Sequence, residues 1–200
     1  MKIAVGLKAH SGWAALVSIA APDGVAQVVE RRRIELVQPD DVDWAKAPYH
    51  AAEGLEPADA RDVVKRGIQS ARRLAVRELR AILARANEAR HQIAACAVLT
   101  APPMPDWSVE QILSVHFRMH QAEGVLFRDS LARATEACGV KLVAIVEKEL
   151  PEVAERALAT PRSGLAKRIA ALGEGIGAPW AKDQKDAALA ALVALCRGVD

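Results

Sequence analysis

Two apolar runs, at residues 3–8 and 13–20, open the chain, and a short polar turn separates them. This pattern predicts a β-hairpin. Pro22, Asp23 and Gly24 form a strong turn signal, and the apolar positions between 25 and 37 predict a third strand beside the second. Strands joined by short turns pair antiparallel, so we expect a three-stranded meander with Arg31, Arg32 and Arg33 partway along its last strand.

Helical periodicity follows this meander. The stretch 39–56 shows no regular period and is expected to be a loop, whereas Pro57 is favourable as a first helical residue. From there to residue 90, apolar residues recur at spacings of three and four, which predicts one long amphipathic helix. A short apolar run at 93–100 then predicts a buried strand.

A second long helix is predicted from residue 108 to about residue 138. Ser108 and Gln111 have the spacing of a capping box, which marks its start. Gly139 is a typical residue to end it. Gly124 lies inside this helix, where glycine costs about 1 kcal/mol relative to alanine, and suggests close approach by another backbone or by a ligand.

The last part of the chain continues the alternation of strand and helix. Residues 142–146 predict a fifth strand, and helices are expected across 151–172 and from about 181 to 197, with a glycine-rich loop at 173–179 between them. Strands that alternate with helices pair in parallel. The order therefore predicts a single α/β domain over residues 1–200. Its mixed five-stranded sheet would have three antiparallel strands, then two parallel ones, and helices on both faces.

Composition narrows the class of protein. The chain is 52% hydrophobic and 26% charged, which is typical of a packed core and excludes extended disorder. A net charge of +2 is small, so any attraction to anions must come from local clusters. No run is long and uninterrupted enough for a signal peptide or a membrane span, so we expect a cytoplasmic protein that does not bind membranes.

The three cysteines, Cys96, Cys138 and Cys196, are far apart and lie among apolar residues. We expect buried, reduced side chains, because their spacing provides neither a disulfide framework nor a close pair for structural zinc.

Two local patterns strengthen one interpretation of the fold. Residues 5–14 (VGLKAHSGWA) look like the first strand and turn of the ribonuclease H-like superfamily, and residues 182–190 (KDQKDAALA) look like the acidic start of its closing helix. With the order of elements, the chain resembles this superfamily over nearly its whole length. The superfamily includes Holliday-junction resolvases, so the resemblance implies a ribonuclease H-like fold.

The resemblance also implies that the nuclease site is degenerate. Family nucleases hold two metal ions between carboxylates, chiefly an aspartate of the first strand, but the matching residue here is Lys8, and a second acidic position falls near Thr100. A lysine among the ligands repels divalent cations. The residual acids would be Glu147, Asp183 and Asp186, and we expect no metal among them. A residual metal-dependent nuclease stays as an alternative.

In such a fold the first hairpin turn would face the start of the last helix across a cleft. The residues concerned are Lys8, His10, Ser11, Trp180, Lys182 and Lys185. Lysines and the amide groups of a helix N-terminus attract phosphate groups. This cleft predicts a binding site for a phosphate-containing ligand or nucleic acid. Alternatively, Trp180 fills the core and the lysines are solvated.

The sharpest local pattern is His116, His120 and Glu123, whose spacings of four and three place them on one helix face. They could hold one zinc, iron or manganese ion, or act as the catalytic acid and base of an enzyme. Alternatively, His120 and Glu123 form hydrogen bonds to neighbouring loops, and His116 lies at the edge of the core. Tyr49 and His50 could reach a site, although a single loop histidine is typical of polar surface.

The long helix at 57–90 carries nine basic and four acidic side chains. With the arginines at 31–33 it could lie along a phosphate backbone; a solvated face or a homodimer contact are the alternatives. One tyrosine and two phenylalanines argue against stacking on single-stranded bases. The sequence thus predicts a non-nuclease module that binds a phosphate-containing ligand or nucleic acid, with a His/Glu enzyme as the alternative. It does not predict a particular cofactor.

Overall fold

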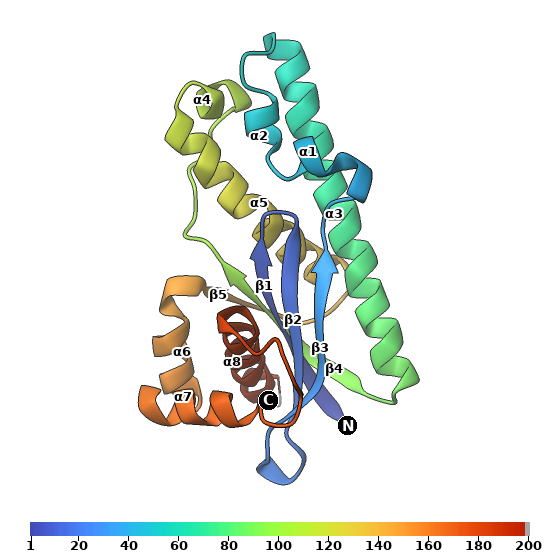
Figure 1. The fold of residues 1–200 in the computed structure, drawn as a ribbon, viewed down its shortest axis with the longest axis vertical. Helices are drawn as coiled ribbons and strands as arrows, with labels where there is room; N and C mark the ends of the chain where they lie inside the picture. The colour runs from blue at the N-terminus through green and yellow to red at the C-terminus, as the bar shows by residue number, and fades with distance from the viewer. Residues whose placement is uncertain (199–200) are drawn as a thin grey trace.

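The computed structural model describes residues 1–198 and contains a mixed five-stranded sheet of order β3-β2-β1-β4-β5 (Figure 1). Strands β1 (Lys2–His10), β2 (Trp13–Ala20) and β3 (Gln27–Glu35) pair antiparallel. Strand β4 (Gln92–Thr100) lies parallel to β1, and β5 (Leu142–Val146) lies parallel to β4. The predicted sheet is confirmed.

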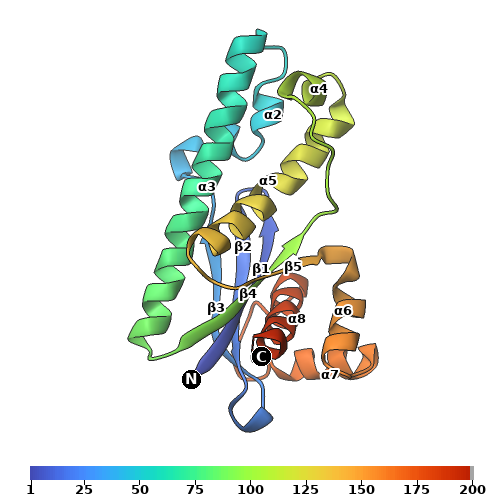
Figure 2. The same ribbon diagram turned by 180° about the vertical axis from the view of Figure 1, so that it is seen from behind.

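Helices cover both faces of this sheet, as expected. One face carries α8 (Lys182–Arg197), with α6 (Leu150–Ala157) and α7 (Arg162–Ala171) packed beside it. The other face carries α3 (Pro57–Glu88) and α5 (His116–Ala137). Figures 1 and 2 view these two layers from opposite sides.

Strand β1 is the centre of the sheet and is buried on both faces from residue 3 to residue 9. Alternation of side chains along the strand sends Ala4 into the core under α8 and Leu7 into the core under α3 and α5. Gly6 shares the face of Ala4, and a Cβ atom there would lie 1.9 Å from the carbonyl oxygen of Ala187. Glycine therefore lets α8 approach the strand at backbone distance.

The predicted helix from 108 to 138 is wrong in one respect, because it is two helices. Helix α4 (Val109–Leu113) begins with the predicted capping box of Ser108 and Gln111, but Val115 is extended, with φ −139° and ψ 111°. Ile112 and Met119, on either side of this break, still pack in one apolar cluster. The apolar spacing thus continues while the backbone turns.

The stretch 39–56 is not wholly a loop. It contains α1 (Val42–Ala45) and α2 (Pro48–Ala51), besides a 3-10 turn at Pro39–Asp41. Tyr49 is buried with residues of α3 and α5, which explains why so short a helix is ordered. Together with α4 and one half of α3, these helices extend beyond the end of the sheet at the β1–β2 turn (Figure 1). Further 3-10 turns span Pro22–Gly24 and Glu147–Glu149.

The expectation of three buried cysteines holds only for Cys96, whose pKa burial raises to about 12. Cys138 is half-buried and Cys196 is exposed near the end of α8. Between residues 1 and 198, no helix has the length and apolar character needed to cross a membrane.

Candidate functional site

Lys8 lies near the end of β1, on the face of the sheet that α8 covers, and only 4% of the residue is exposed. Its ammonium nitrogen Nζ lies 2.7 Å from Asp186, 3.1 Å from Glu147 and 3.2 Å from Asp183. The two aspartates lie one turn apart on α8, and Glu147 directly follows β5. Three distant segments thus bring the predicted residual acids around one buried cation.

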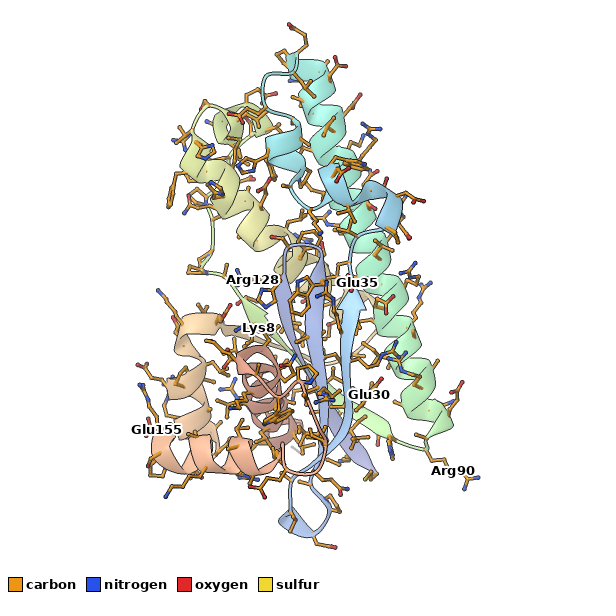
Figure 3. The ribbon with its side chains drawn as sticks, in the orientation of Figure 1. Lys8, Glu30, Glu35, Arg90, Arg128 and Glu155 are labelled. Carbon is orange, nitrogen blue, oxygen red and sulfur yellow. The ribbon has the colours of Figure 1, made fainter. Side chains whose placement is uncertain are left out.

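Each of these carboxylates also has a second basic partner. These partners are Arg128 at 2.6 Å from Glu147, Lys182 at 2.6 Å from Asp186, and His10 at 3.1 Å from Asp183. Figure 3 labels Lys8 and Arg128, which lie close together where α5 passes the end of the sheet. We call this group the Lys8 cluster; it consists of Lys8, His10, Arg128, Glu147, Lys182, Asp183 and Asp186. The positive charges of its two lysines and one arginine balance the negative charges of its three carboxylates.

Burial by itself would lower the pKa of Lys8, but hydrogen bonds to Asp186 and Glu147 outweigh it and raise the pKa above the usual lysine value. For Asp183, burial favours a higher pKa, yet hydrogen bonds from Lys8 and His10 bring the pKa below its usual range. Both changes favour the charged forms. Lys8 and Asp183 are therefore an ion pair at neutral pH.

An open cavity of about 490 Å³ adjoins the Lys8 cluster at the ends of the parallel strands β4 and β5. Thr100, the last residue of β4, lines it where the resemblance places a second acid. The polar wall also includes Arg128, Glu147, Lys148, Lys182 and Asp186. The carboxyl ends of strands in open α/β sheets are common places for ligands.

The six residues of the predicted anion cleft do not line one cavity. Ser11 lines a separate cavity of about 200 Å³ with His10, and Lys185 lines another of about 270 Å³ beside Arg162. Trp180 packs against the core under α8, and its Nε1 donates a hydrogen bond to the carbonyl oxygen of Ile169 at 2.9 Å.

The second candidate site is at the start of α5. The Nε2 atoms of His116 and His120 lie 3.0 Å apart, as their spacing suggested. Glu123 does not contact these two side chains; instead its Oε2 lies 2.8 Å from Nδ1 of His50, and its Oε1 accepts the backbone N–H of His50 at 3.1 Å. The sequence left open whether His50 reaches a site or is only polar surface, and α2 brings it into this group. Its position after Pro48, a residue that can begin a helix, was the available signal.

The prediction that another backbone approaches Gly124 closely is wrong, because a Cβ atom added there would meet nothing within 4 Å. No other backbone packs closely against it. One turn further along α5, Arg128 forms an ion pair with Glu147, and Asp129 forms another, 3.3 Å from Arg72.

A third feature is an arginine row on the exposed side of α3, which we define as Arg73, Arg77 and Arg80. Spacings of four and three place them on one face, where they line an open groove of about 450 Å³ with Arg72 and Val76. Within the described residues, only Arg77 of this row has an acidic partner, the adjacent Glu78. The row is therefore largely available to an anion.

The arginines of β3 serve other purposes. Arg31 donates hydrogen bonds to the carbonyl oxygens of residues 176–179, so it holds the glycine-rich loop against the sheet. Arg32 pairs with Glu30, and Arg33 pairs with Glu35 while lying over the ring of Trp13. These internal partners reduce the positive charge that Arg31, Arg32 and Arg33 could add to that of α3 for binding a phosphate backbone.

The sequence matches no protein-family model and no curated protein. The solved structures that match include that of T. thermophilus RuvC in complex with Holliday junction substrate and that of Thermus thermophilus RuvC. Each has a TM-score of 0.51 at 16% sequence identity, over 96% of this chain and 92% of the other. At this identity the likeness shows the fold alone, and the chain has the mixed α/β, ribonuclease H-like fold that its sequence predicted.

Proposed function

We propose that this protein binds nucleic acid through its phosphates and does not cut it. The observation that carries the second half is the ammonium group of Lys8, which lies within 3.2 Å of Asp186, Glu147 and Asp183. Two-metal hydrolysis of a phosphodiester needs carboxylates that hold two divalent ions about 4 Å apart. A buried lysine competes for the same oxygen atoms and supplies neither a Lewis acid nor a metal-bound hydroxide.

The arginine row on α3 supports the binding half of the proposal. Arg73 and Arg80 are separated by about 10 Å along the helix axis, which suits contacts to successive phosphates. The fold supports it too, since one of the similar RuvC structures is a complex with a Holliday junction. A base-stacking mode has little support, because the chain holds only one tyrosine and two phenylalanines.

The direct test uses a fluorescently labelled four-way DNA junction and a duplex of matching sequence. In low salt we expect wild-type protein to bind both, and to leave both intact with Mg²⁺ or Mn²⁺. Absence of binding in low salt would overturn the first half of the proposal. Metal-dependent cleavage that Asp186→Asn abolishes would overturn the second.

Lys8→Asp tests the role assigned to the lysine. This change would place a fourth carboxylate among Glu147, Asp183 and Asp186, and oxygen ligands hold Mg²⁺ and Mn²⁺. We expect Mn²⁺ to raise the melting temperature of this variant by several degrees and that of the wild type by less than one, measured by differential scanning fluorimetry. Slow Mn²⁺-dependent cleavage of the labelled junction should accompany it. A variant that folds and yet gains no response to Mn²⁺ would show that Lys8 does not stand in for a metal ion.

A further inference from the structure

We propose that His50, His116 and His120 form a binding site for a divalent transition-metal ion, specifically Zn²⁺. The site is separate from the Lys8 cluster and independent of the proposed function. Each histidine offers one ring nitrogen, and the three nitrogens all lie within 4.8 Å of one another. His50 comes from α2, whereas His116 and His120 come from successive turns of α5.

The spacing of the rings suits a single ion. Zinc binds histidine nitrogen at about 2.0–2.1 Å, so in tetrahedral geometry two ligand nitrogens lie about 3.3 Å apart. The Nε2 atoms of His116 and His120 are 3.0 Å apart, and the ring centre of His50 lies 4.8 Å from that of His120 and 5.3 Å from that of His116. Small rotations of two exposed side chains would bring all three nitrogens onto one ion.

Glu123 supplies a second, independent observation. Its carboxylate side chain is only 11% exposed and lies 2.8 Å from Nδ1 of His50. A carboxylate at Nδ1 makes that nitrogen the N–H donor and leaves the lone pair of Nε2 for another partner. Histidines that bind metals usually have such a carboxylate or carbonyl behind them.

A hydrogen bond between His116 and His120 would explain those two rings only. It does not explain why His50, oriented by Glu123, points its ring to the same place. Imidazole ligands suit zinc, copper and nickel, and a site with three neutral histidines keeps the full charge of the ion. The exposure of His116 and His120 leaves a fourth position open to water, as in zinc sites that act on substrates.

The test is calorimetric titration of metal-free wild-type protein with ZnCl₂. We expect one ion per chain with micromolar or stronger affinity. His116→Ala and His120→Ala should each weaken binding at least 100-fold, and because both side chains are exposed the variants should fold normally. Glu123→Gln should weaken binding about 10- to 100-fold, because the orientation of His50 is lost.

Two control variants separate this site from general zinc affinity. His91→Ala removes a histidine at the other end of α3, and Cys196→Ser removes an exposed thiol; neither should change affinity or stoichiometry. With Co²⁺ in place of Zn²⁺, we expect the intense visible absorption of four-coordinate cobalt, lost in His120→Ala. Zinc binding weaker than millimolar, or binding that survives the double change of His116 and His120 to alanine, would overturn the proposal.

Discussion

At the scale of single residues, Lys8 determines the chemistry of its surroundings. An unpaired ammonium group is very costly to bury, and so are unpaired carboxylates. Lys8 and its acidic partners therefore need one another, and the side chains of Glu147, Asp183 and Asp186 are only 22–29% exposed. Removing the cation should cost more than removing a surface lysine that contacts the same acids.

Lys8→Met and Lys182→Met make a matched comparison, because both lysines contact Asp186. We expect Lys8→Met to lower the free energy of unfolding by about 3–5 kcal/mol, as for other broken buried pairs. The side chain of Lys182 is 76% exposed, so Lys182→Met should cost less than about 1 kcal/mol. Urea denaturation at pH 7 measures both, and equal effects would show that the Lys8 cluster is not a buried network.

The pKa changes predict how stability depends on pH. The folded-state pKa of Asp183 is lowered, so its stabilisation is present above the ordinary value of 3.8 and is lost as the pH falls through the folded-state value. The folded-state pKa of Lys8 is raised, so its stabilisation is complete below 10.5 and declines as the pH rises further.

Wild-type protein should therefore lose stability below about pH 4 and above about pH 10.5 through this cluster. The difference in unfolding free energy between wild type and Lys8→Met should be constant between pH 5 and 9 and shrink at both extremes. Denaturation curves across this range check it. A difference that grows in acid would contradict the assigned charges.

Sequence reasoning named Lys8 and the three acids as members of one region but did not foresee their ion pairs. Lys8 and Asp186 are 178 positions apart, and only the docking of α8 on β1 brings them together. The other acids around the predicted cleft are likewise far from Lys8 in the sequence. Its lysines alone therefore could not show whether the cleft carries a net positive charge. His50 could not be assigned to the group of His116 and His120, because short-range patterns do not show that α2 packs on α5.

At the scale of elements, the strands were predictable because β1, β4 and β5 are apolar runs between polar or turn-forming residues. The break between α4 and α5 could not be predicted from the sequence, because the apolar side chains on its two sides keep a helical spacing and pack in one cluster. Helices of four residues such as α1 and α2 are too short to show a period at all. Tertiary packing orders them.

Gly6 and Gly124 offer opposite predictions for the same substitution. In Gly6→Ala the new Cβ would overlap the carbonyl oxygen of Ala187, so α8 must move and the free energy of unfolding should fall by about 3 kcal/mol or more. In Gly124→Ala the Cβ meets open space within a helix, and stability should rise by up to about 1 kcal/mol. Chemical denaturation compares the two. Similar values for both would contradict the close packing of α8 on β1.

At the scale of the whole molecule, the arginine row lies apart from the Lys8 cluster. The cations of the Lys8 cluster lie under α8 or at the end of the sheet, and each is paired with an acid. The arginine row lies on α3, which covers the opposite face of the sheet (Figure 2). A molecule arranged in this way can bind a phosphate backbone on one face without presenting it to Lys8.

The salt dependence of DNA binding tests this separation. Each phosphate contact contributes about 0.9 to the slope of log K against log salt concentration, so changing Arg73, Arg77 and Arg80 together to alanine should reduce the slope by up to about 2.7. Arg162→Ala on α7 removes an exposed arginine from the other face and should leave the slope unchanged. Fluorescence anisotropy of labelled duplex between 50 and 200 mM salt measures all three proteins. A slope that falls in Arg162→Ala but not in the triple variant would place the DNA on the α7 side, beside the Lys8 cluster, and the arginine row would then have no part in binding.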